Sequence, residues 1–349
     1  MRRVIQWATG GVGVAAIQAI AAHPELELVG TWVHSQDKAG RDAGELAGID
    51  PVGVLATTDV DALLALDADC VVYAPLMPDE QLVCRMLAAG LDVVTPLGWV
   101  YPREATALEQ ACQSGGSTLH GTGIHPGGIT ERFPLMVSAL SASITHVRAE
   151  EFSDIRTYGA PAVLRDIMLF GSPPEAALKS PMVGFLGGGF RQSIAMVAAE
   201  LGFRVDPRVE AVNEVAVATA PIDSPMGVIA PGLVAAQRFT WTATVDGTPV
   251  VTARVNWLMG HEDLEPAWDF GPMGERFEVE VTGDPTALVT FQGYQPVSVE
   301  AGLIRNPGVV ATANHCVSAI PYVCAAEAGI KTYLDLPLIA GRAAPHLQR

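Results

Sequence analysis

The chain has 349 residues, of which 49% are hydrophobic and 17% charged, and its formal net charge is −17 at pH 7. Nucleic acids and anionic membranes are bound by basic faces, so this charge argues against both as partners. No run approaches the ~18 consecutive apolar residues of a membrane-spanning helix, and the length allows two domains of roughly 100–200 residues each.

The first third of the chain alternates short apolar runs with helical stretches, which is typical of a parallel sheet with helices on both faces. The predicted strands are residues 3–8, 26–33, 53–57, 70–74, 92–95 and 117–120. The predicted helices are residues 12–22, 59–66, 78–89 and 103–114. We therefore predict an α/β fold whose first domain is a Rossmann-type, doubly wound parallel sheet.

A glycine-rich turn separates the first predicted strand from the first predicted helix. It is a variant of the G-x-G-x-x-G fingerprint in which Ala8 replaces the first glycine. In this motif Gly10 lets the backbone approach a pyrophosphate, and Gly13 lets the helix pack closely on the strand. The helix N-terminus then favours the anionic diphosphate. The residues predicted to bind the dinucleotide here are Thr9, Gly10, Gly11, Val12 and Gly13.

The loop after residues 26–33 bears on the choice between NADP and NAD. NAD-specific enzymes usually place an Asp or Glu here, on the ribose diol. In this loop Ser35 and Lys38 can instead bind a 2′-phosphate. The carboxylate of Asp37 can still reach a ribose. We expect NADP to be preferred and NAD to be possible, with contacts from His34, Ser35, Lys38 and Arg41.

Further loops are expected to complete the cofactor site. Ligands of doubly wound sheets lie beyond the carboxyl ends of the strands, where the loops after successive strands meet. The residues predicted at these exits are Ala74, Pro75, Thr95, Pro96, Leu97, Gly98, Thr122 and Gly123.

The middle of the chain has a different pattern, with longer strands joined by tight turns such as Asp246-Gly247. Strands are predicted at residues 144–152, 210–219, 237–244, 249–259, 276–282 and 287–291, and helices at residues 162–169 and 190–201. The four glycines of residues 184–189 predict a mobile loop or lid hinge. The last fifty residues turn helical again around residues 311–326.

These patterns predict two domains. Residues 1–133, completed by the helical segment 305–349, form the dinucleotide-binding domain. Residues 134–304 form an α+β domain of mostly antiparallel strands, for substrate binding and dimerisation. The cysteines Cys70, Cys84, Cys112, Cys316 and Cys324 form no CxxC pair, so we expect reduced thiols in a cytoplasmic protein and no metal site.

The chain resembles a known family from end to end. Its N-terminal third is similar to the cofactor domain of dihydrodipicolinate reductases, and the whole chain is more similar to the 2,4-diaminopentanoate dehydrogenases and native amine dehydrogenases. The segments that carry the resemblance are residues 7–13, 34–46, 120–127, 157–161 and 311–321. The resemblance implies NAD(P)H-linked interconversion of an amine with an imine or ketone, and homodimers joined through the second domain.

The sequence departs from the family in two places. The stretch K-D-A-P-S-G-T, which dihydrodipicolinate reductases use around their dicarboxylate substrate, is missing, which argues against lysine biosynthesis. The related amine dehydrogenases usually carry acidic residues just after the strand at residues 92–95, and one of them handles the amine proton. This chain has Leu97-Gly98 there.

Two residues are candidates for supplying or accepting the proton that accompanies hydride transfer. His125 follows the last strand of the first domain and titrates near neutral pH when unperturbed; alternatively, it orders its turn or contacts the carboxamide. Tyr158 lies between glycine and proline residues and can hydrogen-bond a substrate oxygen or nitrogen, or it can be a core tyrosine.

The predicted function is reduction of a C=N or C=O bond in a small, fairly apolar substrate with NAD(P)H, or the reverse oxidation. One alternative is an amine dehydrogenase proper, which aminates ketones or aldehydes reductively. Another, from a different class, is a dinucleotide-binding sensor without catalysis. Turnover of NADPH with a carbonyl compound and ammonia would distinguish them.

Overall fold

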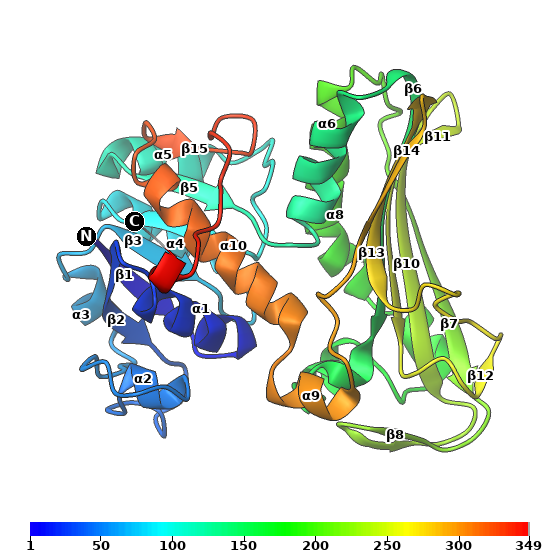
Figure 1. The fold of residues 1–349 in the computed structure, drawn as a ribbon, viewed down its shortest axis with the longest axis horizontal. Coiled ribbons are helices and arrows are strands. Elements are labelled where there is room, and N and C mark those ends of the chain that lie inside the picture. The colour runs from blue at the N-terminus through cyan, green and yellow to red at the C-terminus, as the bar shows by residue number, and fades with distance from the viewer. Residues whose placement is uncertain (348–349) are drawn as a thin grey trace. The chain divides into compact units, whose positions relative to one another are not determined.

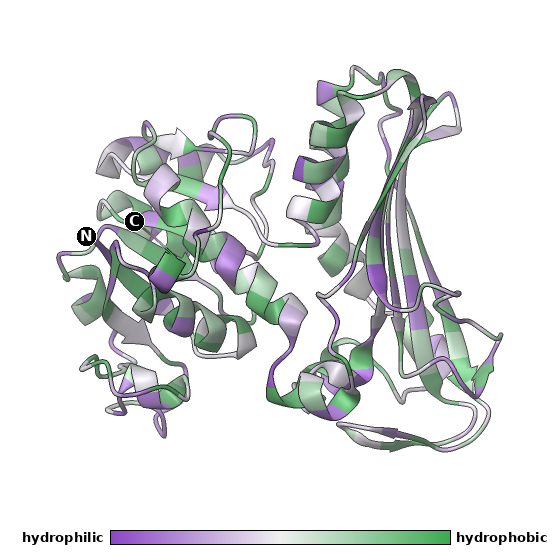
Figure 2. Ribbon diagram, viewed as in Figure 1, coloured by the Kyte–Doolittle hydropathy of each residue, from purple (hydrophilic) through white to green (hydrophobic). Residues whose placement is uncertain are grey.

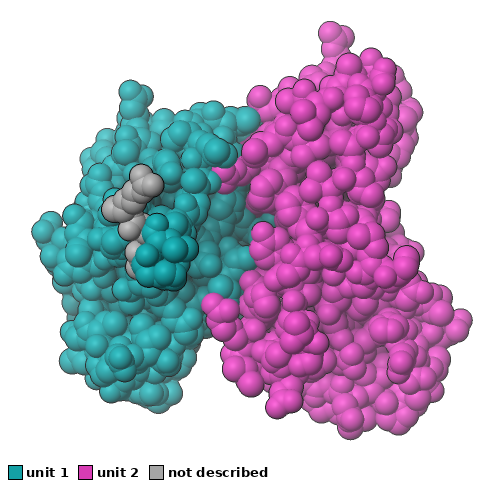
Figure 3. All heavy atoms as spheres, viewed as in Figure 1, with its two compact units in different colours: residues 1–124, 309–349 teal, residues 125–308 magenta. Residues whose placement is uncertain are grey.

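The computed structural model describes residues 1–347, except for the side chains of Met182, Val183, Phe185 and Pro345. The chain forms two compact units, Met1–Ile124 with Val309–Arg349 (unit 1) and His125–Gly308 (unit 2) (Figure 3). The roles expected for the two domains remain proposals. Within residues 1–347, none of the helices combines the length and the apolar character that crossing a membrane requires.

Unit 1 is built on a six-stranded sheet whose paired strands all run parallel. Its strands, in spatial order, are β15 (Gly329–Ile330), β5 (Thr118–Gly121), β4 (Asp92–Thr95), β3 (Cys70–Tyr73), β1 (Arg2–Trp7) and β2 (Leu26–Trp32). The register places Trp7 between Trp32 and Tyr73, and the two indole rings stack with centroids 5.1 Å apart. The doubly wound parallel sheet predicted from the sequence is confirmed.

Helices cover both faces of this sheet (Figure 1). Its helices are α1 (Gly11–Ala21), α2 (Ala43–Leu46), α3 (Val60–Leu64), α4 (Glu80–Ala88), α5 (Thr106–Gly115) and α10 (Pro307–Val323). Alternate strand residues face opposite sides, so that Val4 packs with α1 and α10 while Ile5 packs with α3, α4 and α5. The C-terminal helix α10 therefore completes one of the two hydrophobic cores.

The strand predicted at residues 53–57 is wrong. This segment makes only isolated bridges, from Leu55 to Asp42 and from Thr57 to Trp32. Gly53 has a φ of +77°, which turns the backbone away from a strand conformation. The carboxylate of Asp42 instead accepts hydrogen bonds from the amides of Gly44, Val52 and Gly53 and so holds this segment as an irregular loop.

Unit 2 contains a seven-stranded sheet in which five pairings are antiparallel and one, β11 with β6, is parallel. Its order is β12 (Leu264–Glu265), β7 (Glu210–Ala218), β10 (Val234–Val245), β11 (Thr248–Leu258), β6 (Ala142–Asp154), β13 (Arg276–Asp284) and β14 (Ala287–Phe291). A separate hairpin pairs β8 (Ile222–Ser224) with β9 (Gly227–Ile229). The mostly antiparallel sheet expected from the sequence is confirmed.

The helices of unit 2 are α6 (Phe133–Ser138), α7 (Pro174–Leu178), α8 (Met182–Glu200) and α9 (Val299–Ile304). Shorter helical turns cover Gly128–Arg132, Ile155–Thr157 and Val163–Ile167. The last of these is a single π-helical turn where the sequence predicted a helix over residues 162–169, and Leu169 ends it with a φ of +61°.

The mobile loop or hinge predicted at residues 184–189 is also wrong, because these residues lie inside α8. The glycines serve close packing instead. A Cβ on Gly187 would lie 2.7 Å from Nε1 of Trp241, and one on Gly189 would lie 2.7 Å from Cγ of Pro126. Tertiary contacts thus outweigh the low helix propensity of glycine.

The two faces of the seven-stranded sheet differ. Helices α6 and α8 pack on one face, here called the inner face, where Phe190 of α8 stacks on Trp241 of β10. In the part of the chain that the structure describes, no helix covers the opposite, outer face (Figure 1). Hydrophilic residues interrupt the strands of this sheet about midway along their length (Figure 2).

Candidate active site

The glycine-rich turn of unit 1 has the geometry of a dinucleotide-binding turn. A Cβ on Gly13 would lie 2.1 Å from the carbonyl oxygen of Ala8, so only glycine permits this approach of α1 to the strand exit. A Cβ on Gly10 would meet nothing within 4 Å, which leaves open space where a phosphate can approach the backbone. Ala8 itself has a φ of +74°, a conformation that explains why glycine is usual at this position.

The N-terminus of α1 suits an anion. Gly10 is the N-cap residue and has no side chain to cap the first turn, so no side-chain hydrogen bond occupies the amides there. Unsatisfied amides and the positive end of the helix dipole together favour a phosphate group. The residues present therefore fit the diphosphate of a dinucleotide.

Lys38 reaches back to this turn from the loop after β2. Its Nζ lies 3.3 Å from both the carbonyl oxygen and Oγ1 of Thr9, so the structure brings together two residues predicted separately. On the same loop a hydrogen bond from Ser35 lowers the pKa of the exposed Asp37 carboxylate. His34 and Arg41 are exposed on this loop.

The remaining predicted loops lie along the carboxyl edge of the sheet of unit 1. Backbone hydrogen bonds link the strand exits in order, from Ala8 N to Trp32 O (3.0 Å), from Ala74 N to Trp7 O (3.2 Å) and from Thr122 N to Thr95 O (2.9 Å). The loop after β4 is held by a 3.1 Å hydrogen bond from Leu97 N to Thr95 Oγ1. Pro75, Pro96 and Gly98 lie in the same exits, each only partly buried.

The exit of β5 is fixed by side chains from the C-terminal segment. Thr122 Oγ1 lies 2.6 Å from the Tyr333 hydroxyl, and Nδ1 of His315 donates a 2.6 Å hydrogen bond to the carbonyl oxygen of Gly123. The rings of His315 and Tyr333 stack with centroids 5.7 Å apart. His315 thus packs α10 against the exit of β5.

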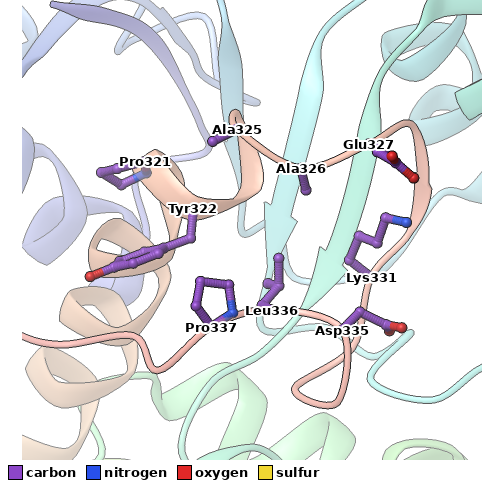
Figure 4. Close-up of a pocket in the computed structure, with 9 residues that line it drawn as sticks. All are labelled: Pro321, Tyr322, Ala325, Ala326, Glu327, Lys331, Asp335, Leu336 and Pro337. Carbon is purple, nitrogen blue, oxygen red and sulfur yellow. The ribbon is translucent and has the colours of Figure 1, made fainter.

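A pocket of about 540 Å³ lies elsewhere in unit 1, between the C-terminal end of α10 and the segment after β15 (Figure 4). Its side chains mix apolar groups with Lys331, Glu327 and Asp335. None of the residues predicted to bind the cofactor lines it. It is therefore separate from the predicted dinucleotide site.

His125, the first residue of unit 2, is enclosed by aromatic rings. Its imidazole centroid lies 4.9 Å from that of Phe190 and 5.7 Å from that of Phe277, and Nε2 donates a 3.3 Å hydrogen bond to the carbonyl oxygen of Arg254. Burial lowers the pKa of His125 to about 3. Because the ring stays neutral near pH 7, this favours the alternative that His125 orders its turn over proton donation.

Tyr158 follows the helical turn Ile155–Thr157 and is partly buried against the core of unit 2. Burial raises the pKa of its phenol, so the hydroxyl keeps its proton through the neutral range. Within residues 1–347 no protein group hydrogen-bonds this hydroxyl. Its predicted contact with substrate remains a proposal.

Two carboxylates with unusual environments were not among the sequence candidates. Glu131 lies in the π-helical turn Gly128–Arg132, is fully buried, and accepts a hydrogen bond from Ser193 of α8. Burial raises its pKa to about 8, so it is protonated at neutral pH.

The second carboxylate is Glu151 on β6. Burial raises its pKa to about 7. Its Oε1 accepts hydrogen bonds from Ser153 Oγ (2.8 Å) and Trp257 Nε1 (3.0 Å). One feature of the sequence indicates that a glutamate of β6 faces the helices. Adjacent strand residues face opposite sides, so of the pair Glu150-Glu151 one carboxylate has to face the helices.

Comparison with known proteins gives matches along the chain. The profile of the 2,4-diaminopentanoate dehydrogenase C-terminal domain matches residues 129–346, and that of the dihydrodipicolinate reductase N-terminus matches residues 1–74. An amine dehydrogenase from Streptomyces virginiae is 33% identical over 359 aligned positions, which cover 97% of each protein. A 2,4-diaminopentanoate dehydrogenase from Acetoanaerobium sticklandii is 26% identical over 68% of this chain and 62% of that protein.

Among solved structures, an amine dehydrogenase from Mycobacterium smegmatis has the same fold. It aligns with a TM-score of 0.77 over 98% of this chain and 97% of its own, at 20% sequence identity. The resemblance noted in the sequence is therefore confirmed over both units.

Proposed function

The chain belongs to the family of 2,4-diaminopentanoate dehydrogenases and amine dehydrogenases, and from this membership we propose that it interconverts a small primary amine and the matching ketone or aldehyde. It is an NAD(P)-dependent oxidoreductase. The observation that carries the proposal is the end-to-end match to an amine dehydrogenase, 33% identical over 97% of the chain. The glycine-rich turn, with space at Gly10 and close packing at Gly13, supports the use of a dinucleotide.

In the direction of amination, the carbonyl compound, an ammonium ion, one proton and NAD(P)H give the alkylammonium ion, water and NAD(P)⁺. The cofactor supplies the hydride. The protein has to hold the substrate and move protons at its nitrogen and oxygen. A substrate of this kind is small and fairly apolar.

The test is an assay of NADPH and NADH oxidation with short ketones and aldehydes, led by 2-pentanone, with and without ammonium chloride. Oxidation that needs ammonium supports the proposal. Oxidation that proceeds equally without ammonium favours carbonyl reduction. Binding of NADPH without turnover of any compound in the set would favour the sensor.

We further propose that NADP is preferred over NAD. Lys38 lies 3.3 Å from Thr9 Oγ1, beside the glycine-rich turn, and Ser35 and Arg41 lie on the same loop. A cation on this loop suits the 2′-phosphate, which NAD lacks. The nearby Asp37 carboxylate repels a 2′-phosphate, so the attraction of Lys38 for the phosphate has to exceed this repulsion.

Lys38→Ala is accordingly expected to weaken NADP binding by about 10- to 150-fold, since a charge-assisted contact contributes roughly 1.5–3 kcal/mol. NAD binding should change little. Titration calorimetry with both cofactors measures this. An equal loss for the two cofactors would contradict a role at the 2′-phosphate.

We assign different roles to the two predicted catalytic residues. Tyr158, whose hydroxyl keeps its proton and is hydrogen-bonded by no group among residues 1–347, is proposed to hydrogen-bond the substrate. His125, neutral and enclosed by Phe190 and Phe277, is proposed to fix the backbone at the start of unit 2.

We also propose a homodimer formed through the outer face of the sheet in unit 2. This face carries a ladder of charges in which arginines and glutamates balance, namely Arg148, Arg254, Arg276, Glu150, Glu278 and Glu280. A charge-balanced ladder can be covered by a second copy without leaving an unpaired charge. The exposed apolar side chains Val212 and Leu288 lie on the same face by register.

Light scattering at micromolar concentration is expected to give twice the chain mass of 36.6 kDa. Leu288→Arg places an unpaired charge on the proposed interface and should shift the mass toward the monomer. A wild-type protein of 36.6 kDa under these conditions would refute the dimer.

A further inference from the structure

The inner face of the sheet in unit 2 carries a group of aromatic side chains near the C-terminal end of β6. Phe277 of β13 stands directly opposite Glu151 in the antiparallel register, so the two side chains share a face. The ring centroid of Phe277 lies 5.7 Å from that of His125 and 6.2 Å from that of Tyr294. The ring centroid of Trp257 on β11 lies 5.8 Å from that of Phe239. We call Trp257, Phe239, Phe277 and Tyr294 the aromatic wall.

Glu151 is the carboxylate set into this wall. Its Oε1 is held by two donors, Trp257 Nε1 at 3.0 Å and Ser153 Oγ at 2.8 Å. Its Oε2 has no protein partner within residues 1–347, and the residue keeps part of its surface accessible to solvent. The carboxylate is thus oriented through one oxygen and available through the other.

The neighbouring acidic groups are already engaged. Glu131 is fully enclosed at 0% exposure and tied to Ser193. Glu275, just before β13, accepts a 2.5 Å hydrogen bond from the amide of Asp154, and Asp154 is paired with Arg156. Glu150, the neighbour on β6, points to the outer face, into the arginine ladder.

These surroundings suit a small organic cation. A half-buried carboxylate attracts an ammonium group strongly because little water screens it. The ring of Trp257, which is only partly buried, can contact the apolar substituents and favour the positive charge. The departure at Leu97-Gly98 leaves the loop after β4 without the acidic residue expected there.

We propose that Glu151 binds the ammonium group of the substrate amine through Oε2 and takes one of its protons during oxidation. This rests on the proposed amine dehydrogenase function. The carboxylate removes a proton from R₂CH–NH₃⁺, and the nitrogen lone pair forms the C=N bond as the hydride leaves Cα for NAD(P)⁺. The products are R₂C=NH₂⁺, the neutral Glu151 carboxylic acid and NAD(P)H, so atoms and charges balance. Water then releases ammonium and the carbonyl compound.

The ionisation of Glu151 fits this task. Burial raises its pKa to about 7. Burial also raises the pKa of the neighbouring Glu275 to about 7, with smaller contributions from the charges of Asp154 and Glu151. The other charged groups at this end of β6 are Asp154 and Arg156, and the nearby His125 stays neutral. A base with a pKa near the working pH can both accept and return a proton.

The test compares the full-length wild type with Glu151→Gln and Glu151→Asp. Glu210→Gln is the matched control, because Glu210 is an exposed glutamate at the start of β7 in the same sheet. Oxidation of small apolar primary amines, led by 2-aminopentane, is followed with NADP⁺ and NAD⁺ from pH 5.5 to 9. Titration calorimetry gives the Kd of 2-aminopentane on the enzyme–NADPH complex and the Kd of NADPH itself.

Glu151→Gln is expected to lower kcat by about 10²–10⁴-fold. Amine binding should weaken by about 10- to 150-fold, the range for a lost charge-assisted contact. The wild-type rate should rise with pH through about 7, and this rise should vanish in the Gln variant. NADPH affinity should be unchanged, which also shows that the variant folds, and Glu151→Asp should recover part of the loss.

Two results would overturn the assignment. If Glu151→Gln keeps more than a tenth of the wild-type kcat and the same pH dependence, another group handles the proton. If Glu151→Gln and Glu210→Gln lose activity equally, the loss comes from removing any negative charge from the protein and not from removing a base at position 151. A different result, in which the wild type binds NADPH but oxidises no amine in the set, would contradict the proposed amine dehydrogenase function itself.

Discussion

Replacing Gly13 with alanine is expected to destabilise the protein by about 1–3 kcal/mol, the usual cost of overpacking, and to abolish most cofactor binding. The new Cβ would lie 2.1 Å from the carbonyl oxygen of Ala8, which is backbone and cannot rotate away. Helix α1 must therefore move off β1, and its N-terminal amides move with it. Losing two phosphate contacts at roughly 1.5–3 kcal/mol each implies at least about a 100-fold loss in affinity for NADPH.

Gly10→Ala is the matched control for this prediction. A Cβ on Gly10 meets nothing within 4 Å, and the φ of −76° suits alanine, so the fold should lose less than about 1 kcal/mol. The same Cβ would occupy the space predicted for the pyrophosphate, so affinity should still fall. Urea unfolding and NADPH titration of both variants separate the two effects. If Gly10→Ala binds NADPH like the wild type, the predicted pyrophosphate position is incorrect.

Glu131→Gln is expected to make the protein more stable than the wild type at pH 8, by an amount that disappears near pH 5. The folded-state pKa of Glu131 is about 8, against 4.5 for an ordinary glutamate. Between these values the folded state holds a proton that the unfolded chain has released, so wild-type stability falls as pH rises. The slope is about 1.4 kcal/mol per pH unit for one such group, which gives roughly 4 kcal/mol between pH 5 and pH 8.

Glutamine has the shape of the protonated acid and can keep the hydrogen bond with Ser193, so it removes the pH dependence without removing the contact. The measurement is urea unfolding of both proteins at pH 5, 6.5 and 8. Glu151 and Glu275 remain in both proteins and cancel in the difference. Two stability curves that stay parallel over this range would show that Glu131 is ionised in the folded protein.

The features that the sequence predicts well are those with local causes. The glycine-rich turn needs only a strand, a helix start and Gly13, and the hairpin at Asp246-Gly247 needs only two residues with positive φ, which the structure shows at 50° and 76°. Strand β14 has the predicted limits because its ends are marked by Pro285 and Gly293.

The features that it does not predict depend on distant partners. Residues 184–189 resemble a loop in isolation, and only contacts with Trp241 and Pro126 explain the glycines of α8. Likewise, Glu151 is one of many glutamates until Trp257, 106 residues later, donates to it. Burial sets the pKa of such a group, and burial is a property of the assembled sheet.

The return of α10 to unit 1 has a consequence for biosynthesis. Val317, Ile320 and Val323 of α10 share a core with Val4 and Ile17, so residues 1–124 alone would leave that face of their sheet with α1 but without α10, and its core incomplete. The contiguous unit His125–Gly308 leaves the ribosome before that helix does. The nascent chain can thus form unit 2 first, while unit 1 has to wait for the segment after residue 308 to complete its core.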